Sequence, residues 1–339
     1  MKMKKDLTTG NVFQTILYFA LPYLLSYFLQ TLYGMADLYI IGQFNGVAAT
    51  TAVSIGSQVM HMLTVIIVGL AMGTTVTVGR AIGAKKTDEA SLAIGNTVTL
   101  FMIVSVVFTL GLLLLLKPIV ALISTPQEAV QGTIQYLFVC FIGIPFITAY
   151  NIISSIFRGL GDSKSPMYFV AVACVANIGL DYLFIGVMSM GPVGAALGTT
   201  LAQTISVAIS LIAIHKKQIG VHLTKKDFKP QVSVMKMLLS IGVPVALQDG
   251  FIQVAFIVIT IIANQRGLNP AAAVGIVEKF ISAAFIVPSS MLATVSALAA
   301  QNIGADKHDR AAKTLYTAML ITSVSVSYTH LTLPTNSRV

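Results

Sequence analysis

The sequence carries very little charge for its length. Only 10% of its 339 residues are Asp, Glu, Lys or Arg, whereas soluble domains are about a quarter charged. Hydrophobic residues make up 56% of the chain, and the mean hydropathy is +0.86. Apolar residues spread this widely exclude a soluble enzyme and require many spanning helices, each of about 20 residues. The lipid bilayer is therefore the expected surroundings of the chain.

Cysteine is scarce, and the common catalytic motifs are absent. The two cysteines, Cys140 and Cys174, lie in apolar runs with no histidine or second thiol at metal-binding spacing. The sequence therefore predicts no disulfide framework, no zinc site and no bound cofactor. The phosphate-binding pattern G-x-x-x-x-G-K-[ST] and the metalloprotease and nucleophile-elbow motifs are also missing. We expect no enzymatic activity and no ATPase subunit, so an ion gradient would have to drive any transport.

The apolar runs predict an all-α polytopic membrane protein. Runs divided by charges, glycine and proline predict eight spanning helices and a shorter ninth, at about 13–41, 50–79, 94–116, 132–156, 167–187, 192–214, 236–264, 271–300 and 312–326. The cytoplasmic side of a membrane protein keeps an excess of Lys and Arg. With a cytoplasmic N-terminus, the inner segments hold seventeen of these residues and the outer loops only Lys117 and Arg266. We therefore expect a multi-pass protein of the cytoplasmic membrane with its N-terminus inside, and no nucleic-acid partner despite the net charge of +9.

An internal repeat predicts the domain organisation. Residues 79–91 align with residues 300–312, with six identities in thirteen positions at an offset of 221, and Pro22 similarly faces Pro244. Six helices fit within one repeat, so the complete protein is expected to have two six-helix lobes arranged as parallel repeats. About eight and a half of these helices are present, which indicates a truncated copy. The expected parts are a lobe at 1–214, a basic cytoplasmic linker at 215–235, a partial second lobe at 236–326 and a non-native tail at 327–339.

Glycines mark two features of this pattern. Gly83 and Gly304, in the two copies of the repeated loop, are expected to cap helix ends, with Thr87 as the N-cap of the next helix. A role of these loops in coupling the lobes is the alternative. Gly69 and Gly73 fit the small-xxx-small pattern of closely packed membrane helices.

Acidic residues inside spanning segments are costly, at about 2.5–3.5 kcal/mol each on insertion scales. Asp37 and Asp181 are expected at nearly the same depth, about 6 and 9 Å from the outer ends of their helices. Asn177 lies one turn before Asp181, and Thr199 reaches a similar depth on the next helix. Two carboxylates, an amide and a hydroxyl suit a hard cation such as Na⁺, or a proton. The structural alternative is that each Asp reaches the interface or caps a helix end.

Aromatic side chains predict where a substrate would bind. Tyr33, Phe146 and Tyr150 lie on helices expected to face a central cleft, where adaptable aromatic surfaces bind varied amphiphiles. Asp249 is a further candidate on the seventh helix, and Glu278 is an intramembrane acid whose partner the sequence does not name. Ordinary packing is the alternative for the aromatic residues, and structural hydrogen bonding for Asp249.

Taken together, these residues resemble the multidrug and toxic compound extrusion (MATE) family. The resemblance runs from about residue 8 to residue 326 and lies in Leu21-Pro22, Gln30-Thr-Leu-Tyr-Gly-Met-Ala-Asp37, Gly79-Arg-Ala-Ile-Gly-Ala, Asn177-x-x-x-Asp181 and Ile241-Gly-Val-Pro-Val-Ala-Leu-Gln248. It implies twelve helices around a V-shaped cleft and the export of cationic or amphiphilic drugs and metabolites in exchange for Na⁺ or H⁺, by alternating access. It also implies that the backbone oxygen of Ala195 joins the cation site, and it adds Gln248 to the substrate candidates.

The sequence departs from the family at one point and leaves one rival open. An acid that some branches carry on the seventh helix is matched here by Ile252 or Gln253, which argues against an acid-based drug site in the second lobe. The rival is a flippase for a lipid or lipid-linked sugar with the same two-lobed architecture. In either case we expect a monomer in the lipid bilayer.

Overall fold

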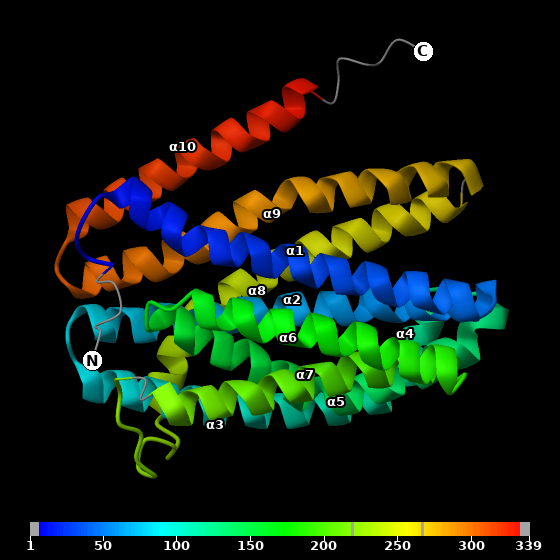
Figure 1. The fold of residues 1–339 in the computed structure, drawn as a ribbon, viewed down its shortest axis with the longest axis horizontal. Helices are drawn as coiled ribbons and strands as arrows, with labels where there is room; N and C mark the ends of the chain where they lie inside the picture. The colour runs from blue at the N-terminus through cyan, green and yellow to red at the C-terminus, as the bar shows by residue number, and fades with distance from the viewer. Residues whose placement is uncertain (1–6, 218–219, 266–267, 333–339) are drawn as a thin grey trace.

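The computed structural model describes residues 7–217, 220–265 and 268–332, and within these ranges it contains helices and no strand (Figure 1). The elements are α1 (Val12–Phe44), α2 (Val47–Gly83), α3 (Thr87–Leu114), α4 (Leu116–Leu122), α5 (Gln127–Gly159), α6 (Lys164–Asp181), the π-helix η1 (Tyr182–Val187), α7 (Gly191–Lys217), α8 (Val232–Gln265), α9 (Leu268–Gly304) and α10 (His308–Thr332).

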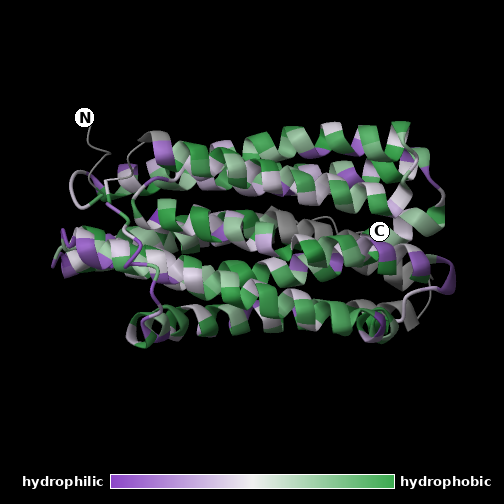
Figure 2. Cartoon of the chain, turned by 90° about the horizontal axis from the view of Figure 1, so that it is seen from below, coloured by the Kyte–Doolittle hydropathy of each residue, from purple (hydrophilic) through white to green (hydrophobic). Residues whose placement is uncertain are grey.

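Eight helices among the described residues are long and apolar enough to cross a membrane, which confirms the predicted number. Apolar residues cover their lengths, and hydrophilic residues gather at the two ends of the bundle (Figure 2). α10 has 25 residues but does not reach the hydropathy of a span, in line with the shorter ninth run. Most predicted boundaries were too narrow, because helices continue beyond their apolar stretches: α3, expected from residue 94, begins at Thr87. Lys86, not Thr87, is the N-cap.

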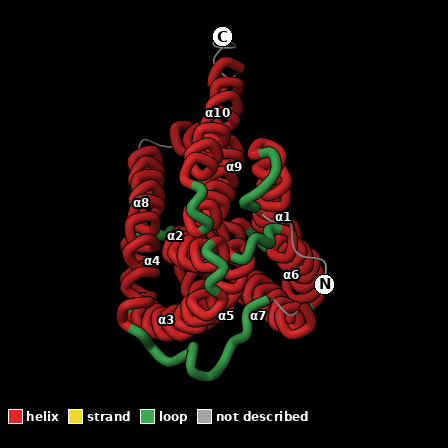
Figure 3. The backbone as a smooth tube through the Cα atoms, turned by 90° about the vertical axis from the view of Figure 1, so that its left-hand side faces the viewer, coloured by secondary structure: helices red, strands yellow, loops and turns green. Residues whose placement is uncertain are grey.

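α2 lies in the middle of the molecule and packs against α5, α8 and α9 (Figure 3). The predicted close packing at Gly69 and Gly73 is confirmed. A Cβ atom at Gly69 would come within 2.7 Å of the Ala246 Cα atom, and one at Gly73 would overlap the Leu238 carbonyl of α8. Only glycine therefore permits this approach of α2 to α8.

The two copies of the repeated loop have the same backbone form, but the glycines do not act as the expected caps. The left-handed residues after α2 and α9 are Lys85 and Asp306, with φ of 60° and 59°. Gly83 and Gly304 instead end their helices in close contact with the opposite helix, since a Cβ atom on Gly83 would overlap the Gln301 carbonyl. The repeat therefore packs the ends of α2 and α9 together.

The linker between α7 and α8 folds back onto α3. We call residues 220–231 the strap. Asn96 of α3 donates from Nδ2 to the Asp227 carbonyl (3.1 Å) and accepts from the Gln231 amide (2.7 Å). Ser91 and Thr99 donate to two further strap carbonyls. α7 reaches Lys217 and α8 begins at Val232, so both helices extend into the range 215–235, whose role as the linker between two lobes stays a prediction.

The two ends of α1 have different surroundings. Its first half lies in a core cluster with α9 and α10 that includes Ile16, Phe19 and Ala297. Farther along, Met35 and Tyr39 are 60% and 68% exposed. The chain has two parts, α1–α7 and α8–α10, and the first half of α1 joins them. The half of α1 that carries Asp37 lies outside this cluster.

Candidate functional site: a buried carboxylate pair

Three helices bring the predicted cation-binding side chains together. α1 carries Asp37, α6 carries Asn177 and Asp181, α7 carries Thr199, and the three helices pack on one another. Asp37 lies seven residues before the end of α1, Asp181 six before the end of η1, and Thr199 eight after the start of α7. At 1.5 Å per residue these depths are about 9–12 Å. The common level was predicted correctly, but Asp37 lies deeper than expected because α1 continues to Phe44.

The acids and the amide are buried. The exposed fraction is 4% for Asp37, 1% for Asn177 and 0% for Asp181. Thr199 Oγ1 donates to Asp37 Oδ2 at 3.3 Å. Gly198, the residue before Thr199 on α7, lies against Oδ1 of Asp181. Both carboxylates therefore lie beside the same turn of α7 inside the protein.

Most polar atoms of this cluster have no hydrogen-bond partner among the described residues. These buried atoms are Asp37 Oδ1, both side-chain polar atoms of Asn177 and both carboxylate oxygens of Asp181. A buried carboxylate without a partner is strongly destabilising unless a cation or proton compensates it. Oxygens of carboxylate, amide and hydroxyl groups are the ligands that hard cations prefer. The donor set thus fits Na⁺ and equally fits a shared proton.

Two features of the site were not predicted from the sequence. α6 changes to the π-helix η1 directly after Asp181, and wide turns of this kind are frequent at functional sites. Gly198 of α7 lies against Asp181, and a Cβ atom there would overlap Oδ1. The run Gly191–Gly198 contains three glycines, which is the only signal that could have indicated a close approach.

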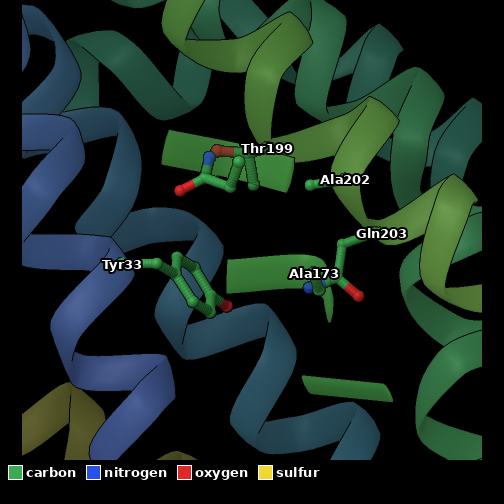
Figure 4. A pocket seen from close by; sticks show the side chains of 6 residues that line it. Tyr33, Ala173, Thr199, Ala202 and Gln203 are labelled. Carbon is green, nitrogen blue, oxygen red and sulfur yellow. The ribbon is translucent and has the colours of Figure 1, made fainter. Parts of the chain in front are cut away.

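A narrow pocket borders the cluster (Figure 4). Tyr33 reaches it from α1, and Ala202 and Gln203 from α7, beside Asn177 and Thr199. Gln203 lies one turn after Thr199, is 9% exposed, and its Oε1 has no partner in the described part of the chain. The prediction of Tyr33 as a site residue thus gains a polar neighbour that sequence reasoning did not find.

The remaining candidates are distributed over the molecule. Ala195 is fully buried one turn before Thr199, and its role as a backbone ligand stays a prediction. Tyr150 lines a second cavity, whereas Phe146 is 42% exposed and lines neither. On α8, Gln248 is exposed and Asp249 partly buried. Tyr33 and Tyr150 thus line different pockets in the described part of the chain, and a common substrate site stays a prediction. The side chain of Glu278 lies outside the described residues.

Comparison with known proteins identifies a family and several relatives of this chain. The family model MatE matches residues 22–183 and 244–333. The probable multidrug resistance protein YpnP of Bacillus subtilis is 30% identical over 305 residues, which cover 90% of this chain and 68% of that protein. The probable multidrug resistance protein YoeA of the same organism is 27% identical over 88% of this chain and 66% of its own length. The chain thus spans about two thirds of the length of these curated relatives.

Solved structures share the fold. A transporter of the MOP superfamily from Pyrococcus furiosus superposes with a TM-score of 0.86 at 24% identity, over 95% of this chain and 72% of the other. An outward-facing multidrug resistance MATE transporter superposes with a TM-score of 0.84 at the same identity, over 94% and 72%.

Proposed function

We propose, because this chain belongs to the multidrug and toxic compound extrusion family, that its complete protein exports amphiphilic or cationic small molecules across the cytoplasmic membrane in exchange for Na⁺ or H⁺. The curated relatives are named as multidrug resistance proteins, which supports transport of this kind. Members of the family are transporters and not enzymes. We further propose that the protein is a monomer and that its N-terminus is cytoplasmic; the distribution of Lys and Arg supports the orientation.

The observation that carries the ion-coupling proposal is a set of buried oxygens at Asp37, Asn177 and Asp181 that have no hydrogen-bond partner in the described part of the chain. Two neighbouring carboxylates in a low-dielectric interior are strongly unfavourable when both are ionised and uncompensated. Either a Na⁺ ion shared by the pair or protonation of one carboxyl removes this cost.

The same chemistry suggests how the carboxylates couple ion and substrate movement. When the ion is bound, the carboxylates of Asp37 on α1 and Asp181 on α6 are both attracted to it. When the ion leaves, the two carboxylates repel each other. α1 is also the helix that contacts α9 and α10 at its other end. A change in the charge state of Asp37 can therefore bias how α1 packs against the second half, as a ligand shifts a conformational equilibrium by its differential affinity.

The test is dye or drug flux in proteoliposomes that contain the protein from its complete gene, with a Na⁺ gradient and a pH gradient imposed separately. We expect one gradient to drive export and to identify the coupling ion. Asp37→Asn and Asp181→Asn should each abolish coupled export while the protein still inserts and folds. Asp88→Asn, an exposed acid in the first turn of α3, is the matched control and should transport normally.

Normal export by both site variants would contradict the ion site. A folded protein with no flux under either gradient would instead favour the lipid flippase, which a fluorescent-lipid scrambling assay in the same vesicles would detect.

A further inference from the structure

A second cavity lies in the part of the chain formed by α1–α7, away from the carboxylate pair. α1, α2 and α5 enclose it with the start of α6, and it shares no lining residue with the pocket beside Asp37. Its volume is about 40 Å³, enough for a few water molecules or a small end group but not for a drug-sized molecule. Polar side chains dominate the lining, among them Tyr23, Ser26, Tyr27, Gln30, Asn151 and Arg158.

Arg158 is the one charged side chain in the lining that the structure describes. Its Nη2 atom donates to Ser155 Oγ at 2.7 Å, and its guanidinium lies 5.1 Å from the centre of the Tyr23 ring. A guanidinium has five N–H donors, and the described residues provide an acceptor for only one of these bonds.

No carboxylate among the described residues pairs with Arg158. Within that part of the chain, the ion pairs are Lys86 with Glu89 and Asp306 with His308. The last turn of α5, which carries Arg158, offers only a partial negative charge from the helix dipole. A partly buried cation in a polar cavity, with four donors left over, is well suited to an anion.

The neighbouring rings define what the anion is attached to. Tyr23 and Tyr27 are stacked with ring centres 6.2 Å apart and an angle of 29° between the planes. A guanidinium beside stacked aromatic rings binds a planar or tetrahedral oxyanion through paired hydrogen bonds and an apolar body through the ring faces. A cationic end group would meet Arg158 as a like charge.

From this geometry we propose that the Arg158 cavity binds the oxyanion end, a carboxylate or phosphate, of an aromatic or otherwise apolar molecule. Calling that molecule a substrate rests on the proposed transport function, but the site itself does not. Transported compounds would then include acidic amphiphiles, with the anion at Arg158 and the coupling ion at the separate Asp37–Asp181 site.

The test compares two probes that share a ring system and differ in charge, 2-naphthoate and 2-naphthylmethylammonium. Equilibrium binding to the purified protein in phosphatidylcholine nanodiscs is followed by probe fluorescence, to which the chain itself adds no tryptophan signal because it contains no tryptophan. We expect naphthoate to bind at least tenfold more tightly than the ammonium probe. Arg158→Gln should weaken naphthoate at least tenfold, whereas Lys86→Gln, which changes an exposed cation outside the cavity lining, should not.

A second variant tests the same proposal if the Arg158→Gln protein does not fold. Gln30→Glu keeps the side-chain size but adds a negative charge to the cavity, so it should also weaken naphthoate and should not weaken the ammonium probe. Equal affinity for the two probes, or unchanged naphthoate affinity in both variants, would overturn the proposal.

Two competition arms distinguish the sources of the oxyanion. Competition by phosphatidylglycerol added to the nanodiscs, lost in Arg158→Gln, would identify a lipid headgroup; competition by inorganic phosphate alone would identify a soluble anion. Binding is measured without any gradient, so failed flux would leave this result standing, and absence of naphthoate binding would leave ion-coupled export untouched.

Discussion

At the scale of single residues, the carboxylate pair depends on a glycine that contributes no side chain. Gly198 leaves the space that Asp181 Oδ1 occupies. In Gly198→Ala the new methyl group would displace the Asp181 carboxyl from its position, and misplacement of about 1 Å can reduce a site's function about 100-fold. We expect coupled flux to fall by at least tenfold in the proteoliposome assay.

The control for this substitution is Gly179→Ala. Gly179 lies on α6 two residues before Asp181 and is exposed, and a Cβ atom added there would meet no other atom within 4 Å in the described part of the chain. Flux through Gly179→Ala should equal that of the unmodified protein. Equal flux through Gly198→Ala as well would mean that the position of Asp181 does not limit coupling.

At the scale of elements, the contact of α2 with α8 depends on missing side chains. A Cβ atom at Gly73 would overlap the Leu238 carbonyl, so Gly73→Ala must separate the two helices. Overpacking of this kind costs about 1–3 kcal/mol. We expect the thermal unfolding midpoint in detergent to fall by several degrees. Gly111→Ala on α3 adds the same methyl group in open space, and a similar loss there would rule out the packing explanation.

The strap is held to α3 by one side chain above all. Asn96 is fully buried and bonds the Asp227 carbonyl and the Gln231 amide, so Asn96→Ala removes both bonds at once. The strap carries Lys225, Lys226 and Lys229, and we expect trypsin to cut there several-fold faster in the variant. Cleavage at the exposed Lys85 and Lys86 in the same sample is the internal control. Unchanged cleavage of the strap would show that Asn96 does not restrain it.

The strap also contains a carboxylate that responds to pH. Thr224 donates from its backbone amide and from Oγ1 to Asp227 Oδ2, at 2.7 and 2.8 Å, and these bonds lower the pKa of Asp227. The folded turn therefore favours the ionised form, so its contribution is complete above the ordinary pKa of about 3.9 and is lost as the pH falls through the lower folded value. Hydrogen exchange of amides 224–229, corrected for intrinsic rates, should rise in that acidic range. In Asp227→Asn this pH dependence should disappear.

At the scale of the whole molecule, sequence reasoning worked where a fixed periodicity applies. The number of spans follows from hydrophobic length, and the common depth of Asp37, Asp181 and Thr199 follows from the constant rise of a helix. What it missed depends on contacts between distant segments. The strap on α3, Gly198 against Asp181 and the approach of Gly83 to Gln301 have no local pattern, and the Arg158 cavity is formed by several helices that the sequence does not juxtapose.

The last prediction concerns the joint between the two parts of the chain. Arg310, at the start of α10, donates to the carbonyls of Gly10 (2.6 Å) and Thr9 (2.7 Å), and Lys307 donates to that of Thr8 (2.9 Å). Hydrogen bonds to charged groups contribute about 1.5–3 kcal/mol each when shielded from water, and less at this exposed position. If alternating access separates the two parts at this end, Arg310→Ala should shift the population toward the separated form.

Spin labels at Thr9 and Asp309, both exposed, would measure this shift by pulsed dipolar spectroscopy after replacement of the two buried cysteines by alanine. We expect a longer-distance population to grow in Arg310→Ala and to grow further when Lys307 is also replaced by alanine, because the two cations bind different carbonyls of the same segment. Lys313→Ala is the matched control. Lys313 is exposed one turn along α10 from Arg310, and in the described structure its side chain is not among those that bond residues 8–10, so the distances should stay unchanged. Identical distributions in all variants would mean that the core cluster of Ile16, Phe19 and Ala297 holds this end together without the cations.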